Sequence, residues 1–175
     1  MTVPLTEQEQ RLWHAWKIAA DKVRQRVAED LKAGSGLSDQ DFGILTRLAE
    51  LGGGKLRQND LGALLRWDRT RLSHQLTRME NRGLVSRSAV DGGVLVRVTD
   101  EGVRLVRVAR PIHAAAVREH LLQRTEGIDH AALLRALEQL ALAPDPVSIA
   151  DPLPNTDGDE SCPTVAPRSD RLRQQ

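Results

Sequence analysis

The chain has 175 residues, which is enough for one domain of ordinary size with residues left over. Aromatic residues make up only 2% of it, which disfavours proteins that bind single-stranded nucleic acid by stacking bases on aromatic rings. The net charge of +1 is unevenly distributed: residues 57–107 hold ten Arg against six acids, whereas residues 144–175 hold three Arg against six acids.

The N-terminal part is predicted to form two helices. Thr6–Glu9 matches a capping box, and apolar residues then recur every three or four positions up to the break at 34–36. Ser38–Asp41 is a second capping box and opens a helix that stops before the three glycines at 52–54. We expect these glycines to form only a turn between helices.

A helix-turn-helix motif is predicted next. A short helix spans Gln58–Leu65, and a break at Arg66-Trp67 follows it. Asp68 then caps a helix that runs to about Arg82 and is closed by Gly83. Two short helices joined by so short a turn are typical of this motif.

After Gly83 the apolar period changes from 3.6 to 2, which predicts a β-hairpin. Its strands are residues 84–87 and 94–98, with Asp91-Gly92-Gly93 in the connecting turn. A helix is predicted from Thr99 to about residue 122, kinked at Pro111, and a last helix covers about 129–142. Residues 144–175 lack periodicity and are predicted to be disordered.

The predicted fold is therefore mainly α with a small β wing. We expect a winged helix-turn-helix DNA-binding domain at 37–98 and a helical dimerisation region made of 1–36 and 99–143.

The helix after Asp68 is the candidate reading element. Leu72, Leu76 and Met79 form one narrow inward stripe. The opposite arc carries only hydrogen-bonding or cationic side chains, namely Thr70, Arg71, His74, Gln75, Arg78 and Arg82. Because a carboxylate would be repelled by phosphates, an arc without acids favours DNA binding. The other interpretation is a solvated helix that is rich in Arg by chance.

The order of elements resembles the MarR family of bacterial transcription regulators over residues 5–142. The resemblance is carried by Leu56–Leu61, by Arg71–Val85 and by Val98–Gly102, while Arg11-Leu12-Trp13, His113 and Val117-Arg118 resemble an actinobacterial branch. It implies a homodimer that binds double-stranded DNA and whose operator affinity responds to a small ligand or chemical signal.

The wing departs from the family pattern. Family wings carry an Asp-x-Arg tip whose Arg enters the minor groove, but here the tip reads Val90-Asp91-Gly92-Gly93. Minor-groove contacts would then come from the backbone of Gly92 and Gly93 or from Arg87 and Arg97. The predicted DNA-contacting residues are Arg57, Gln58, Arg69, Thr70, Arg71, Ser73, His74, Gln75, Arg78, Arg87, Gly92, Gly93 and Arg97.

Other sites have weaker support. Trp13, His14, Trp16 and Trp67 are candidates for a pocket that binds a small aromatic effector, although packing in the core or dimer is the simpler explanation for Trp13 and Trp16, which fall beside the apolar stripe. His113 and His120 share a helix face but lack a ligand cluster, and Cys162 lies in an acidic stretch, so no metal site and no redox switch are predicted. No cofactor is expected.

The sequence thus predicts a homodimeric regulator, in particular a repressor, that binds a pseudo-palindromic operator. No nucleophile–base or phosphate-binding motif indicates an enzyme. No apolar run approaches the roughly 18 residues of a membrane span, so a cytoplasmic protein is expected. The alternative is a constitutive or architectural winged-helix protein that binds DNA without sensing a ligand.

Overall fold

The computed structural model describes residues 3–142. The segment 144–175, for which the sequence predicts disorder, lies outside the described residues. The chain divides into two compact units, Met1–His130 and Ala131–Gln175.

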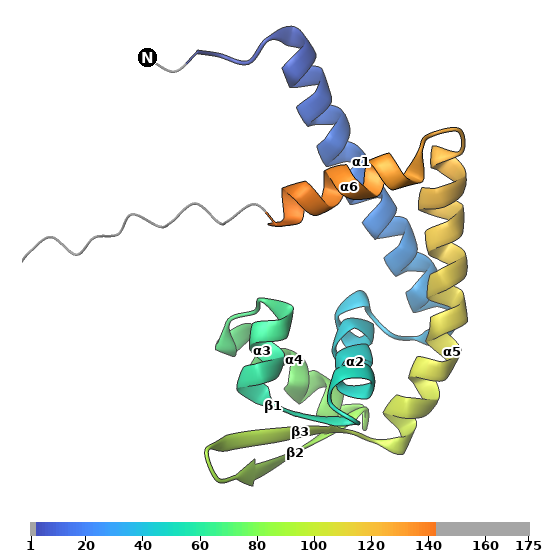
Figure 1. Ribbon diagram of the computed structural model, residues 1–175. Coiled ribbons are helices and arrows are strands. Elements are labelled where there is room, and N and C mark those ends of the chain that lie inside the picture. Colours follow the sequence, from blue (N-terminus) through green and yellow to red (C-terminus); the bar gives the residue numbers. More distant parts are fainter. Residues whose placement is uncertain (1–2, 143–175) are drawn as a thin grey trace, which may run out of the picture. The chain divides into compact units, whose positions relative to one another are not determined.

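Helix α1 (Glu7–Ser35) begins where the capping box predicted it (Figure 1). The backbone N–H of Thr6 donates to Glu9 Oε2 at 2.7 Å. Hydrogen bonds from the backbone and side chain of Thr6 hold the pKa of Glu9 below its usual value. Every residue from Glu7 to Ala19 is exposed, whereas Val27 and Leu31 are buried. Only the C-terminal half of α1 therefore packs within this unit.

The helix-turn-helix elements match the prediction closely. Helix α2 spans Asp39–Leu51, with Ser38 and Asp41 forming the predicted capping box. Helix α3 spans Gln58–Leu65, and helix α4 spans Arg69–Asn81 with Asp68 as its N-cap.

A three-stranded antiparallel sheet accompanies these helices. Strands β2 (Val85–Val90) and β3 (Gly93–Val98) form the predicted hairpin. Strand β1 (Lys55–Arg57) pairs with the other side of β3, which gives the order β1-β3-β2. The glycines at 52–54 form a turn as expected, but the strand that follows them was not predicted, because three residues are too few to show a strand period of their own.

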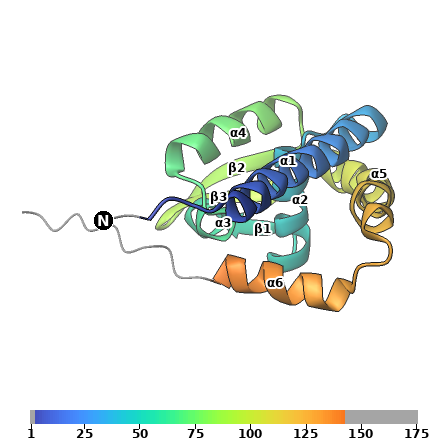
Figure 2. The ribbon, with the colours of Figure 1, turned by 90° about the horizontal axis from the view of Figure 1, so that it is seen from above.

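Helix α5 (Asp100–Val117) starts directly after β3, with Thr99 as its N-cap. It continues through Pro111 and then changes at Arg118–Leu122 to a π-helical turn, η1, followed by the 3-10 turn η2 at Gln123–Thr125. α1 and α5 lie side by side in Figures 1 and 2.

One apolar core holds this unit together, and helices α1 to α5 and the sheet all contribute to it. Its buried members are Leu31, Leu37, Phe42, Ile44, Leu45, Leu48, Leu61, Leu72, Leu76, Met79, Leu84, Val85, Val96, Val106 and Ala109. Burial of these side chains places α3, α4 and the hairpin in fixed positions.

Helix α6 (His130–Leu142) begins within one residue of its predicted start. None of its residues is buried, and Leu134, Leu140 and Leu142 are all more than half exposed. None of the helices in the described part of the chain is long and apolar enough to cross a membrane.

Candidate nucleic-acid interface

Helix α4 has the two faces that its sequence predicts. Leu72, Leu76 and Met79 are buried to 1% exposure or less. The outward side chains are Arg69, Thr70, Arg71, His74, Thr77 and Arg78, all of which are exposed. The exposed surface of α4 is thus cationic and hydrogen-bonding, as a face directed at DNA requires.

The N-terminus of α4 is held by two local contacts. The Oδ1 atom of Asp68 accepts the backbone N–H of Arg71 at 2.8 Å, which satisfies an otherwise free helix donor. The guanidinium carbon of Arg71 lies 4.2 Å from the centroid of the Trp67 ring. The two contacts fix the first turn of α4, on which Arg71 is exposed.

Gln75 does not belong to the outward face. It is only 5% exposed, and its Nε2 donates to Asp41 Oδ1 at 2.7 Å, while its Oε1 accepts from Arg78. The expectation that Gln75 lies on the outward arc of this helix is therefore wrong. Gln75 can be buried beside the apolar stripe because a carboxylate on α2 accepts a hydrogen bond from its amide.

That partner, Asp41, is a structural residue for which the sequence predicts only a capping role. Its side chain is 2% exposed and accepts hydrogen bonds from the backbone of Ser38, from Gln75 and from Arg82. Arg82 also donates to the carbonyl of Gly36 at 2.9 Å. Arg82 and Asp41 thus fasten the C-terminal end of α4 to α2 and to the loop before it.

Arg87 fastens the wing to α4 in a similar way. Its Nη2 lies 2.7 Å from Glu80 Oε2, and its backbone N–H donates to Glu80 Oε1 at 3.0 Å. The side-chain hydrogen bond from Arg87 is the main reason that the pKa of Glu80 is lowered. Arg87, predicted to contact the minor groove, is paired inside the protein and sets the position of strand β2 relative to α4.

Arg57 reaches the tip of the wing. Its Nη1 donates to the carbonyl of Asp91 at 2.7 Å, so a side chain at the start of α3 supports the hairpin turn. Gly92 has φ +78°, and a Cβ there would lie 3.2 Å from this same Nη1. The tip, which has no arginine of its own, is thus supplied with a guanidinium from β1.

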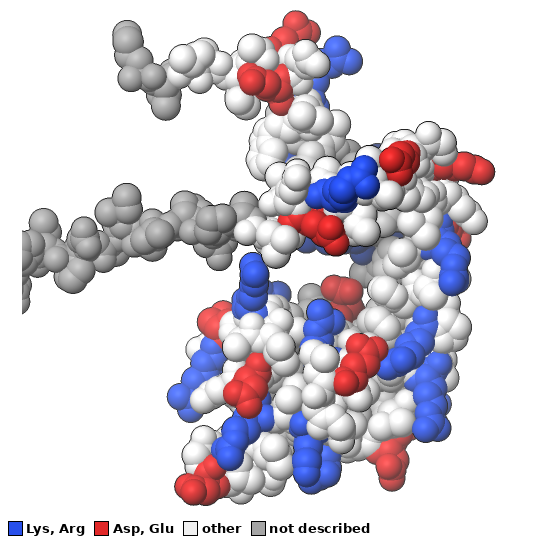
Figure 3. All heavy atoms as spheres, viewed as in Figure 1, with Lys and Arg blue, Asp and Glu red and all other residues white. Residues whose placement is uncertain are grey.

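Several predicted contact residues line one groove between α4 and the wing. Its volume is about 400 Å³, and it is lined by Gln58, Arg69, Ser73, Glu80, Arg87, Ser88, Ala89 and Val94. Gly93 and Arg97 are exposed on strand β3. On the face of the molecule seen in Figure 3, cations and acids alternate, so that face does not carry one continuous basic patch.

The residues predicted to line an effector pocket lie in different surroundings. Trp13 and Trp16 are 51% and 43% exposed on α1, and His14 between them is exposed too. Trp67 instead packs against the core of the helix-turn-helix and under Arg71. The indoles therefore occupy different environments.

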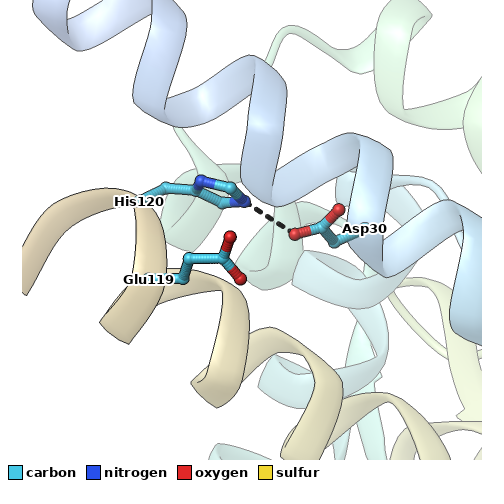
Figure 4. A group of neighbouring side chains, drawn as sticks. All are labelled: Asp30, Glu119 and His120. Atoms are coloured by element: carbon cyan, nitrogen blue, oxygen red, sulfur yellow. Dashed lines mark hydrogen bonds and ion pairs between the residues drawn. The ribbon is translucent and has the colours of Figure 1, made fainter. Parts of the chain in front are cut away.

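Asp30, Glu119 and His120 are the one group of ligand-type side chains within residues 3–142 whose donor atoms all lie within 4.8 Å of one another (Figure 4). His120 Nε2 lies 2.7 Å from Asp30 Oδ2, and this contact joins α1 to the π-helical turn η1. His120 Nδ1 is buried and has no hydrogen-bond partner among these residues. Because a metal-binding histidine usually donates its second N–H to an acceptor, we interpret the group as a link between helices.

Comparisons with known proteins agree with this geometry. A family model described as MarR family matches residues 35–93. The crystal structure of AbsC, a MarR family transcriptional regulator from Streptomyces coelicolor, is 33% identical, covers 80% of this chain and 96% of AbsC, and has a TM-score of 0.73. The chain belongs to the MarR family of transcriptional regulators.

A second MarR family regulator from Streptomyces coelicolor, Sco3205, was solved in complex with DNA. It is 28% identical, with a TM-score of 0.76 over 85% of this chain and 96% of Sco3205. The organohalide-sensing regulator RdhR-CbdbA1625, solved with 2,4-dichlorophenol, is 21% identical to this chain. The match covers 80% of this chain and 85% of that regulator with a TM-score of 0.67, so the two share the fold. A search of curated proteins finds no match. The MarR fold, and with it the winged helix predicted from the sequence, is confirmed.

Proposed function

We propose that this MarR family protein is a repressor that binds a pseudo-palindromic operator as a homodimer, with α4 in the major groove and the wing beside it. The observation that carries the proposal is the exposed face of α4, on which Arg69, Thr70, Arg71 and His74 stand without a neighbouring exposed acid apart from the Asp68 cap. This face adjoins the groove that the wing lines. The relative Sco3205 was solved in complex with DNA, which supports DNA binding by this chain.

The homodimer is supported by apolar side chains that the single chain leaves uncovered. Leu12 is 72% exposed on α1, and Leu140 is 67% exposed on α6. A symmetric pair would bury such surfaces and present two copies of α4 about 34–36 Å apart, one DNA turn. Light scattering at micromolar concentration should give twice the 19.4 kDa of one chain, and a mass of one chain would contradict the dimer.

DNA binding is tested with a duplex that the full-length protein selects from a random library and with a scrambled duplex as control. If Arg71 reads a base, Arg71→Ala should weaken binding to the selected duplex by about 1–3 kcal/mol per contact and leave the scrambled duplex nearly unaffected. Arg57→Ala removes a cation from the wing tip and should weaken both duplexes. It should also reduce the salt dependence of log K by about 0.9 for each phosphate that the variant no longer neutralises. Normal binding by both variants would exclude α4 and the wing tip as the interface.

Release by a small aromatic effector is the finer part of the proposal. A relative with the same fold was solved with 2,4-dichlorophenol, and another with p-coumaroyl-CoA. In this chain a cavity of about 310 Å³ is lined by Lys22, Val23, Gln25, Arg26, His120 and Arg124, and this volume suits a small ligand. A melting-temperature screen with small aromatic acids tests it. If none of them raises the Tm or releases DNA, the constitutive regulator is the better description.

A further inference from the structure

Trp67 lies between the two helices of the motif, in a turn with unusual backbone geometry. Arg66 ends α3 with φ +51°, the one positive φ at a residue other than glycine among residues 3–142. The backbone N–H of Trp67 then donates to Gly62 O at 3.0 Å. This bond and packing against the core hold the indole in place at the start of α4.

The guanidinium of Arg71 lies over that indole. The guanidinium carbon lies 4.2 Å from the ring centroid, within the range of a favourable cation–π interaction. Other arginines of this region are bonded to protein groups: Arg78 to Gln75, Arg82 to Asp41 and Arg87 to Glu80. For Arg71, no carboxylate within 4.0 Å is found in the described part of the chain.

A guanidinium that lies over a ring can keep its hydrogen-bonding edge available. Stacking uses the face of the guanidinium, whereas bidentate hydrogen bonding to guanine O6 and N7 uses N–H groups at its edge. A free arginine loses much side-chain entropy when it is ordered on DNA, and a side chain that is already ordered loses less. The indole can therefore orient Arg71 before DNA is bound, without competing for its donors.

We propose that Trp67 is a positioning residue for Arg71 and that it raises the sequence specificity of DNA binding by holding this guanidinium toward the base edges. The inference rests on the proposed function, because it assumes that α4 enters the major groove. Trp67, which the sequence suggested as a wall of an effector pocket, is thereby assigned to DNA recognition.

A double-mutant cycle in the full-length protein tests this inference, with the selected and scrambled duplexes as probes. Arg71→Ala should weaken binding to the selected duplex by about tenfold to a hundredfold. Trp67→Leu, which keeps an apolar side chain but removes the ring, should weaken it by about threefold to tenfold. Trp67→Phe, which keeps a ring, should stay near the wild type. Scrambled-duplex binding should change little in each case.

The decisive comparison is Trp67→Leu in the background of Arg71→Ala. If Trp67 acts through Arg71, the double variant should bind the selected duplex as the single Arg71→Ala variant does. Equal losses from Trp67→Leu in both backgrounds, or equal losses on both duplexes, would overturn the proposal and show a structural role. Normal binding by Arg71→Ala would overturn it as well, by showing that Arg71 is not a reader. Failure of the protein to select any duplex would instead contradict the proposed function.

A measurement on the free wild-type protein keeps the test independent of how Trp67→Leu folds. If the stack exists in solution, the ring current of Trp67 should shift the Arg71 δ-proton NMR signals upfield. Trp13 and Trp16 lie on α1, whereas Trp67 lies in the turn between α3 and α4. Trp67→Phe is the matched control and should reduce the shift if Trp67 causes it. Signals at the positions of an unstacked arginine would overturn the proposal.

Discussion

The winged helix (37–98) and the helices α1 and α6, here called the outer helices, bury their apolar residues very differently. In the winged helix, Leu45, Leu61, Leu76 and Val96 are all fully buried. In the first half of α1 and in α6, no residue is buried, although both carry leucines. The DNA-binding part thus has a complete core within one chain, whereas the outer helices have apolar surfaces that only another surface can cover. The two regions should respond differently to mutation.

The largest effect is expected from charge on the outer helices. Leu12→Glu combined with Leu140→Glu places carboxylates on surfaces that are already mostly exposed, so the single chain loses little packing. The mass in light scattering should fall to that of one chain, and affinity for the selected duplex should drop by about 10²–10⁴, because the two half-sites are no longer bound by linked copies. Gln8→Glu with Gln139→Glu is the matched control. A double leucine variant that keeps the wild-type mass would show that these leucines do not pair.

Asp41→Ala should affect the winged helix itself. It removes the buried acceptor of Gln75 and Arg82 and should lower the free energy of unfolding by about 3–5 kcal/mol in urea denaturation. Asp39→Ala, which removes an exposed acid in the same first turn of α2, should cost far less. Equal losses from both variants would mean that the buried network adds nothing beyond helix capping.

Gly92→Ala should have an intermediate effect, confined to the wing tip. A Cβ at φ +78° costs about 1–2 kcal/mol, and it would also crowd the guanidinium of Arg57. Gly43 lies in helix α2, and a Cβ there would meet open space. Gly43→Ala should therefore stabilise the protein, by up to about 1 kcal/mol. Thermal denaturation of both variants measures the difference, and a neutral Gly92→Ala would show that the tip rearranges freely.

The smallest effect is expected from the Glu80–Arg87 pair. Because the pKa of Glu80 is lowered in the folded protein, its contribution to stability is present above the unfolded pKa and is lost as the pH falls through the folded value. Glu80 is 37% exposed in its side chain, so the pair should contribute at most about 0.5 kcal/mol. The difference in stability between wild type and Glu80→Gln should therefore be present at pH 7 and vanish in strong acid. A difference that persists in acid would contradict the ion pair.

Periodicity and capping predicted the six α-helices of the described residues and the wing, but not the π-helical and 3-10 turns that follow α5. Both signals depend on neighbours within a few residues, such as Thr6 with Glu9 or Ser38 with Asp41, and can therefore be read locally. Strand β1 could not be predicted in this way, since Leu56 becomes part of a sheet only through its pairing with Val96, forty residues later.

The candidate site was predicted less completely, for the same reason. Thr70, Arg71, His74 and Arg78 were correctly expected on the outward face of α4, because helical geometry alone decides it. Gln75 was misplaced because its burial depends on Asp41, on another helix. The partners of Arg57 and Arg87 are likewise set by tertiary contacts, with Asp91 and Glu80, that periodicity does not reveal.

The junction between β3 and α5 has a mechanical consequence. The Thr99 hydroxyl donates to Gly83 O at 2.6 Å and accepts the N–H of Gly102 at 3.1 Å, and a Cβ at Gly102 would collide with the carbonyl of Leu84. The end of α4, the base of the β2-β3 hairpin and the start of α5 are therefore in direct contact with one another. α5 has 18 residues and is roughly 27 Å long, so a tilt of about 5° displaces one end by about 2 Å relative to the other. With no loop at this junction to absorb such a tilt, a movement of α5 should displace α4 and the wing with it.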